Sequence, residues 1–211
     1  MGTRRAVLLL GGLTLLGGCG FKLRQPPKLA FDTIRSPGNF ATPVARELLR
    51  ALEQAELYHS PLDEAADQSL MCSFKSLLPA HAVLQDDIDL EVEGRLIRAR
   101  HVGEGVAWFD FVALCDGPRS QNDYIELARE YHTVILSNVP GLGRATDDQA
   151  RRFVNLVDEF YDRQVKLVIS AERPLAQLYS SGKLDFEFQR TVSRLLEMQS
   201  HEYLARPHRP E

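Results

Sequence analysis

Two arginines near the end of the sequence could take part in phosphoryl-transfer chemistry. Arg190 and Arg194 are four residues apart, so they share one face of a helix. An arginine reaching into a neighbouring subunit can stabilise the charge on a transferring phosphoryl group. The alternative is a structural role in ion pairs within the helix, from Arg190 to Glu187 and from Arg194 to Glu197. We favour the ion pairs and keep the two arginines as catalytic candidates.

Asn138 is the third candidate for such chemistry. It comes at the end of the apolar run HTVILSN, which is typical of a buried strand. Ligands of open α/β sheets bind at the carboxyl ends of strands, so this amide could face a phosphate or a water molecule. Asparagine is also a common turn residue at such positions.

The groups that would hold the phosphates themselves are missing from the sequence. No G-x-x-x-x-G-K-S/T motif is present, so no Walker A loop is predicted. The run from Leu156 to Glu159 has the apolar-Asp-Glu look of a Walker B segment. Asp158 and Glu159 fall in the middle of an amphipathic helix, however, which predicts a solvated helix face instead. The six histidines lack metal-ligand spacing, and we expect no metal site in the protein.

Cys19 points to a different chemistry. A short apolar run follows the basic pair Arg4 and Arg5 and ends at the sequence Leu16-Gly17-Gly18-Cys19, which resembles a bacterial lipobox. The run is too short to span a bilayer but suits a secretory signal. We expect residues 1–19 to be a signal peptide and Cys19 to carry acyl chains that anchor the chain to a membrane. The other cysteines, Cys72 and Cys115, stand among apolar residues, which favours buried free thiols over a bridge between them.

Composition limits the class of partner. The formal net charge is −4 and 44% of the residues are hydrophobic, as in an ordinary soluble protein with a real core. No run of five like charges and no basic patch is visible, so we expect no binding to nucleic acid.

Hydrophobic periodicity predicts the elements that position these residues. Between residues 20 and 54, Leu29 to Ile34 should form a strand and the residues after Thr42 a helix. Residues 55–105 should hold an amphipathic helix with Leu62, Ala66, Leu70 and Phe74 on one face, then a hairpin that turns at Gly94 and Arg95. Residues 106–208 should alternate strands (106–111, 132–139, 165–170) with helices (120–131, 147–163, 186–204). The predicted fold class is α/β, with a parallel sheet of about three strands flanked by helices. One edge of so small a sheet should be exposed, and self-association through it is expected.

The first 54 residues resemble the start of the LptE family. The resemblance rests on CGFKLR after the lipobox and on the strand and helix that follow. It implies a lipoprotein of the outer membrane, facing the periplasm, that binds the barrel protein LptD and assists lipopolysaccharide assembly.

Residues 58–208 resemble the C-terminal part of the ZapE family. The segments that carry the resemblance are VAWFDFVALCDGPRSQNDYIELAREYHTVILSNVP, ARRFVNLVDEFYDRQVKLVISAERPLAQLY and FEFQRTVSRLLEMQSHEYL. It implies part of an AAA+-like P-loop ATPase that uses ATP with magnesium, contacts proteins of the cell-division ring and works in the cytoplasm. Because Walker A and Walker B are absent, we expect this chain to be inactive alone.

The two resemblances imply opposite compartments. They meet between residues 54 and 58 without a linker rich in proline, glycine or serine, which favours a fusion of two unrelated segments.

Overall fold

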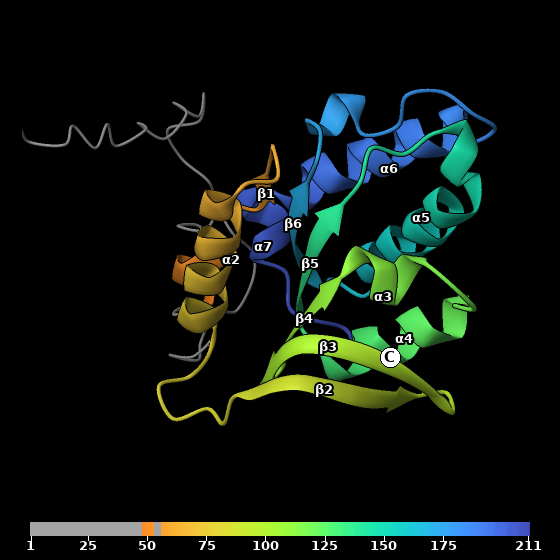
Figure 1. Ribbon diagram of the computed structural model, residues 1–211. Helices are drawn as coiled ribbons and strands as arrows, with labels where there is room; N and C mark the ends of the chain where they lie inside the picture. Colours follow the sequence, from red (N-terminus) through yellow and green to blue (C-terminus); the bar gives the residue numbers. More distant parts are fainter. Residues whose placement is uncertain (1–47, 53–55) are drawn as a thin grey trace, which may run out of the picture. The chain divides into compact units, whose positions relative to one another are not determined.

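The structure, a computed structural model, describes residues 48–52 and 56–211. Its centre is a six-stranded sheet with the strand order β1-β6-β5-β4-β3-β2 (Figure 1). The strands are β1 (Tyr58–His59), β2 (Gln85–Val92), β3 (Arg95–Gly103), β4 (Val106–Asp110), β5 (Thr133–Val139) and β6 (Lys166–Ala171).

The sheet combines a parallel half with an antiparallel half. Strands β1, β6, β5 and β4 run parallel, as expected for strands joined through helices. The hairpin of β2 and β3 pairs antiparallel and joins the same sheet through β4. The prediction of an α/β fold is confirmed, but the expected three-stranded parallel sheet is too small. The prediction left out β1, and it treated the hairpin of β2 and β3 as a separate unit.

Most of the helices lie where the 3.6-residue periodicity placed them, with small differences at their ends, but the short helix at residues 111–115 was not expected. Leu62, expected on the apolar face of the amphipathic helix within residues 55–105, precedes that helix and is exposed. The helices are α2 (Glu64–Leu77), α3 (Phe111–Cys115), α4 (Gln121–Glu130), α5 (Asp147–Asp162), α6 (Asp185–Met198) and α7 (His201–Leu204), with short 3-10 turns at Arg144–Thr146 and Leu175–Gln177. The single long helix expected at 186–204 is wrong. α6 ends at Met198, and Ser200 begins α7 by accepting a hydrogen bond from the Tyr203 N–H.

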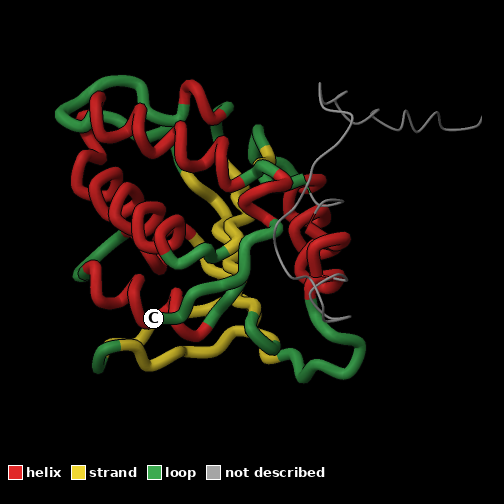
Figure 2. Tube along the Cα trace, turned by 180° about the vertical axis from the view of Figure 1, so that it is seen from behind, coloured by secondary structure: helices red, strands yellow, loops and turns green. Residues whose placement is uncertain are grey.

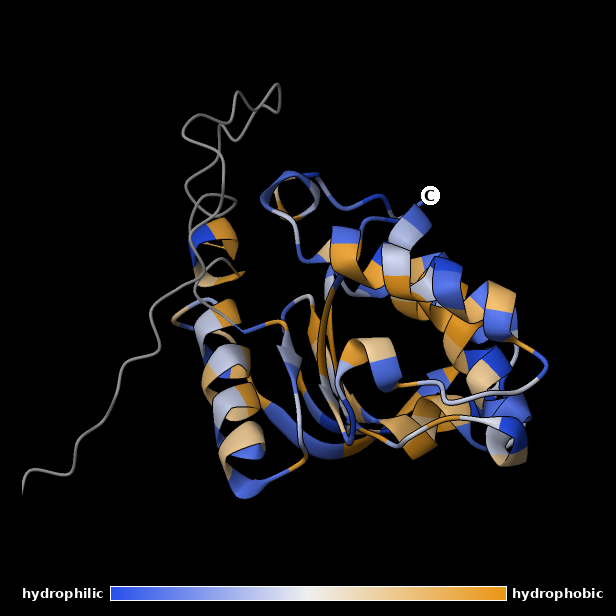
Figure 3. Ribbon diagram, turned by 90° about the horizontal axis from the view of Figure 1, so that it is seen from above, coloured by the Kyte–Doolittle hydropathy of each residue, from blue (hydrophilic) through white to orange (hydrophobic). Residues whose placement is uncertain are grey.

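Helices cover both faces of the sheet, because the buried strands carry apolar residues on both sides (Figures 1 and 2). Ala107, Val134 and Leu167 point into a core formed with α3, α4, α5 and α6. Trp108, Ile135 and Val168 point into a second cluster with α2 and the helical residues 48–52. Figure 3 shows the hydrophobic residues gathered on the strands and on the helix sides that face them.

The chain's last residues return to the body of the domain. Nε2 of His208 lies 2.6 Å from the carbonyl oxygen of Ala128 in α4, and the amide of Arg209 donates to the carbonyl of Arg163. The C-terminus therefore lies beside α4 (Figure 2).

Several predictions concern residues outside the described part. The signal peptide, Cys19 and the LptE-like strand all fall within residues 1–47 and stay predictions. No helix among residues 48–52 and 56–211 is long and apolar enough to cross a membrane. Cys72 and Cys115 are both free thiols; Cys115 is buried as expected, whereas Cys72 is exposed, on the outer side of α2.

Candidate functional site at the carboxyl ends of the strands

A polar network joins the carboxyl ends of β4 and β5. Asp110 ends β4 and lies beside Ser137 in the register of the two strands. The Ser137 hydroxyl donates to Oδ1 of Asp110 over 2.9 Å, and Nδ2 of Asn138 donates to the same oxygen over 2.7 Å. The structure therefore brings the predicted residue Asn138 together with a carboxylate and a hydroxyl on neighbouring strands, where ligands bind in open α/β sheets.

The backbone at Asn138 has an unusual conformation. Its φ is +62°, in the left-handed region that asparagine adopts more readily than most residues. The pairing of β5 with β6 shifts register between Leu136 and Val139, so Asn138 stands out of the ladder. Its N–H donates instead to Oγ of Ser170 in β6 over 3.2 Å. Asn138 thus acts as a turn residue that also carries an exposed side-chain amide. Its position fits both interpretations of the sequence, a turn residue and a polar group at a strand end.

Arg100 of β3 brings a positive charge to the network. Its guanidinium lies 3.6 Å from carboxylate oxygens of both Asp67 in α2 and Asp110, and Nη1 donates to the Ser137 hydroxyl over 3.2 Å. The same guanidinium packs 4.8 Å from the centre of the Trp108 ring. Arg100 is therefore held between two carboxylates and an aromatic face, and it ties α2 to the sheet.

The polar groups of the network are engaged with one another. Magnesium takes oxygen ligands from one or two carboxylates together with phosphates. Oδ1 of Asp110 already accepts two hydrogen bonds, and Arg100 is already shared between two carboxylates. Within the described residues no group of three or more His, Cys, Asp or Glu side chains could hold a metal ion. The positive charge of Arg100 is thus shared between the two carboxylates of the network.

Arg190 and Arg194 lie away from this network, in the interface between α5 and α6. Nη2 of Arg190 contacts Oδ2 of Asp158 over 2.8 Å, and Arg194 contacts the other oxygen of the same carboxylate. The expected ion pairs within the helix are wrong, because Glu197 instead accepts from the Tyr161 hydroxyl and pairs with Arg206. Both arginines thus hold α6 against α5.

The expected solvated face of α5 is also wrong at Asp158 and Glu159. Asp158 is three-quarters buried between its two arginines, and Glu159 is buried with Arg163 and Gln121 as partners. Their position in the middle of α5 agrees with the conclusion that they are no Walker B pair. The sequence pattern of one helix shows which of its sides is polar, but it does not show whether another helix packs against that side.

A second polar cluster lies at the opposite, amino ends of the strands. Lys166 begins β6 and is buried, with its ammonium donating to the carbonyls of Tyr203 and Arg206 over 3.0 and 2.8 Å. Burial, aided by the charge of Arg206, lowers the pKa of Lys166 to about 7. Burial and the positive charges of His208 and Lys166 likewise lower the pKa of His132 to about 4. Lys166 therefore fixes the C-terminal helix α7 and the residues after it to the sheet.

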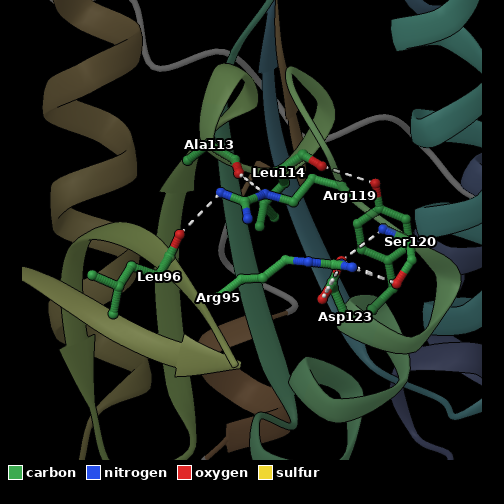
Figure 4. Close-up of polar contacts among 8 residues, drawn as sticks. Arg95, Leu96, Ala113, Leu114, Arg119, Ser120 and Asp123 are labelled. Atoms are coloured by element: carbon green, nitrogen blue, oxygen red, sulfur yellow. Dashed lines mark hydrogen bonds and ion pairs between the residues drawn. The ribbon is translucent and has the colours of Figure 1, made fainter. Parts of the chain in front are cut away.

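A third set of contacts fixes the β2–β3 hairpin to the helices (Figure 4). Nη1 of Arg95 contacts both oxygens of Asp123, at 2.9 and 3.2 Å, and Asp123 is completely buried. The same carboxylate accepts from the amide and hydroxyl of Ser120 at the start of α4. Arg119 donates to the carbonyls of Leu96 and Ala113. The tip of the hairpin is thereby held by charge-assisted hydrogen bonds.

Known proteins are similar in sequence to this chain over most of its length. The profile of the AFG1-like ATPase family matches residues 45–207. The cell division protein ZapE of Escherichia coli is 45% identical over 160 residues, which cover 76% of this chain and 42% of that protein. Lactation elevated protein 1 homolog B of Danio rerio is 33% identical over 183 residues, 70% of this chain and 36% of that protein. The chain thus spans about two-fifths of the length of the curated relatives it matches.

The comparisons also correct one predicted boundary. The family match begins at residue 45 and not at 58, so residues 45–54, which we gave to the LptE-like segment, fall inside it. The structure agrees, since Leu52 is buried in the same cluster as Leu70 and Trp108. No solved structure gave a significant match to the chain. The match over residues 45–207 covers more than half of the sequence and shows that the chain belongs to the AFG1-like ATPase family.

Proposed function

We propose that this chain acts in a ZapE-like protein of bacterial cell division that uses ATP. The observation that carries the proposal is the 45% identity over 160 residues with the E. coli cell division protein ZapE. The family match implies ATP with magnesium as the cofactor. Proteins of the division ring are the partners we propose for the chain.

We further propose that the chain does not hydrolyse ATP by itself. The sequence has no phosphate-binding loop motif. At the carboxyl ends of the strands, Asp110 and Arg100 are engaged with each other and with neighbouring side chains. The described domain would then contribute surfaces and positioning to an ATPase, while the groups that hold phosphate and magnesium come from outside residues 56–211.

ATP turnover by the purified chain tests this second proposal. Phosphate release in the presence of magnesium and ATP should stay at the background level, and a fluorescent ATP analogue should not bind at micromolar concentration. Turnover well above background would refute the proposal. If that turnover fell in Asn138→Ala, Arg190→Ala or Arg194→Ala but not in Lys183→Ala, the predicted catalytic candidates would be supported instead.

The proposed role in division has a separate test. A fluorescent fusion of the chain should gather at the division site of growing bacteria, and a variant lacking residues 45–207 should not. An even distribution of the full fusion through dividing cells would count against the role, whatever the outcome of the ATPase assay.

A further inference from the structure

The outer edge of β2 is an open strand edge. In the described part of the chain β2 pairs only with β3, on its inner side. The hairpin turns through Glu93 and Gly94, which both have positive φ, as in a two-residue type I′ turn. Val92 and Arg95 then form the first hydrogen-bonded pair, and the pairs alternate from there. The N–H and C=O groups of Asp89 and Glu91 consequently point away from β3, toward the open edge.

This edge is held in place and does not depend on a partner for its shape. Ile88, Leu90 and Val92 of β2 pack against the main core on the side of α4. Arg95 and Arg119 fix the start of β3 to the α3–α4 segment, as Figure 4 shows. A strand whose backbone groups are already ordered loses less conformational entropy when another strand joins it.

Negative charge surrounds the open edge. Asp86, Asp87, Asp89 and Glu91 of β2 are all exposed. Asp86 is paired with His101, and Asp87 and Asp89 are paired with Arg98, so the carboxylates of the edge outnumber their basic partners in β3. A hollow of about 310 Å³ lies between the end of β2 and α4, lined by Glu91, Val92, Glu93, Glu126, Arg129 and Glu130. The single cation in that hollow, Arg129, is paired with Glu126. No ion pair involves Glu91 or Glu93 within residues 56–211.

The charge decides between the occupants that an open edge can have. A second copy of this chain would place Asp89 and Glu91 against the same residues of its own edge, and like charges facing each other across strands are destabilising. An extended segment with lysine or arginine side chains would instead meet these carboxylates while its backbone completes the ladder. We propose that the β2 edge binds an extended, lysine- or arginine-bearing peptide segment of a partner protein as a seventh strand. The proposal stands on the edge alone and is independent of the proposed ATPase role.

A peptide that can pair through its backbone tests the proposal. The probe is a fluorescently labelled ten-residue peptide of alternating lysine and valine, and its anisotropy is measured against the full chain. The same peptide with glutamate in place of lysine tests the charge. The lysine peptide with N-methylated amides tests the strand pairing. We expect both control peptides to bind at least about tenfold more weakly than the probe.

Variants of the chain locate the site. Glu91→Lys should weaken binding of the probe about tenfold, because it replaces an attraction by a repulsion. Glu91→Pro should also weaken it, since it removes an outward N–H without breaking the pairing with β3. Glu202→Lys makes the same charge change at an exposed position of α7 and should alter binding less than twofold. Thermal melting confirms that each variant is folded.

Amide exchange gives a direct view of the edge. The amides of Asp89 and Glu91 should exchange at least about tenfold more slowly when the probe is bound. The proposal would be overturned if the N-methylated peptide bound as tightly as the probe, or if Glu91→Lys and Glu202→Lys weakened binding equally. It would also be overturned if the probe did not bind at all. In the last case the carboxylates would serve only to keep the edge from pairing.

Discussion

Lys166 allows a pH-dependent stability to be worked out from the structure. The folded pKa of about 7 lies far below the value of about 10.4 in an unfolded chain, so the unfolded state binds more protons over this range. The contribution of Lys166 to stability is therefore complete above the unfolded pKa and is lost as the pH falls toward 7. Between pH 8 and pH 6 the loss amounts to about 1.4 kcal/mol.

The variant Lys166→Met isolates this effect. Methionine fills a similar space but leaves the carbonyls of Tyr203 and Arg206 without their donor, which costs about 2 kcal/mol at pH 8. At pH 6 the wild-type protein has itself lost about 1.4 kcal/mol, so the difference between the two proteins should shrink to roughly 0.6 kcal/mol.

Urea unfolding at pH 6, 7 and 8, followed by circular dichroism, measures the difference. Lys183→Met serves as the control, because Lys183 is exposed, and its difference from wild type should not change with pH. A stability difference for Lys166→Met that stays constant from pH 6 to pH 8 would refute the reasoning. It would mean that the two backbone carbonyls keep the ammonium fully charged throughout this range.

Three further predictions concern other residues. The pKa of His132 is about 4 in the folded protein and about 6.5 in the unfolded chain, so the unfolded state takes up a proton first as the pH falls. The free energy of unfolding should therefore drop by up to about 2 kcal/mol between pH 7 and pH 5. Urea unfolding of His132→Gln should show no such drop. Asp123→Ala leaves Arg95 and the start of α4 without their buried acceptor and should lower the unfolding free energy by about 3 kcal/mol; a loss below about 1 kcal/mol would contradict the role given to this carboxylate. Cys19 should incorporate an alkyne-tagged palmitate when the chain is expressed in bacteria, and Cys19→Ser should remove the label; an unlabelled wild-type chain would end the prediction of a lipid anchor.

The parallel strands could be predicted because burial on both faces leaves a continuous apolar run. Val134 to Leu136 and Leu167 to Ile169 have no polar interruption, and short runs of this kind are typical of strands buried between two helix layers. β1 could not be predicted in this way, since two residues carry no period. The hairpin was visible from its alternation, but its membership of the same sheet depends on the pairing of Val102 and Gly103 with β4.

The candidate site was predictable only in part, for a related reason. The position of Asn138 at a strand end follows from its own sequence. Its partners Asp110 and Ser170 belong to other strands, and their proximity depends on the register between strands. Asp110 does follow the apolar run Val106 to Phe109, so strand ends compared with one another could have suggested it. Nothing local to Arg190 and Arg194 indicates that their shared partner is Asp158, 32 and 36 residues earlier in the chain.

The arrangement of charges bears on what the chain contributes to an ATPase of this family. The carboxyl ends of parallel strands are the usual place for a ligand in such a sheet. Here Arg100 and Asp110 neutralise each other, and Arg100 also holds α2 through Asp67. A ligand that took either group would leave a partly buried charge unpaired and would loosen α2, which is costly. The open backbone of β2 and the carboxylates of Glu91 and Glu93 can be bound without breaking an ion pair within residues 56–211. The proposed peptide site at the hairpin would therefore leave the contacts between the strand ends and α2 intact.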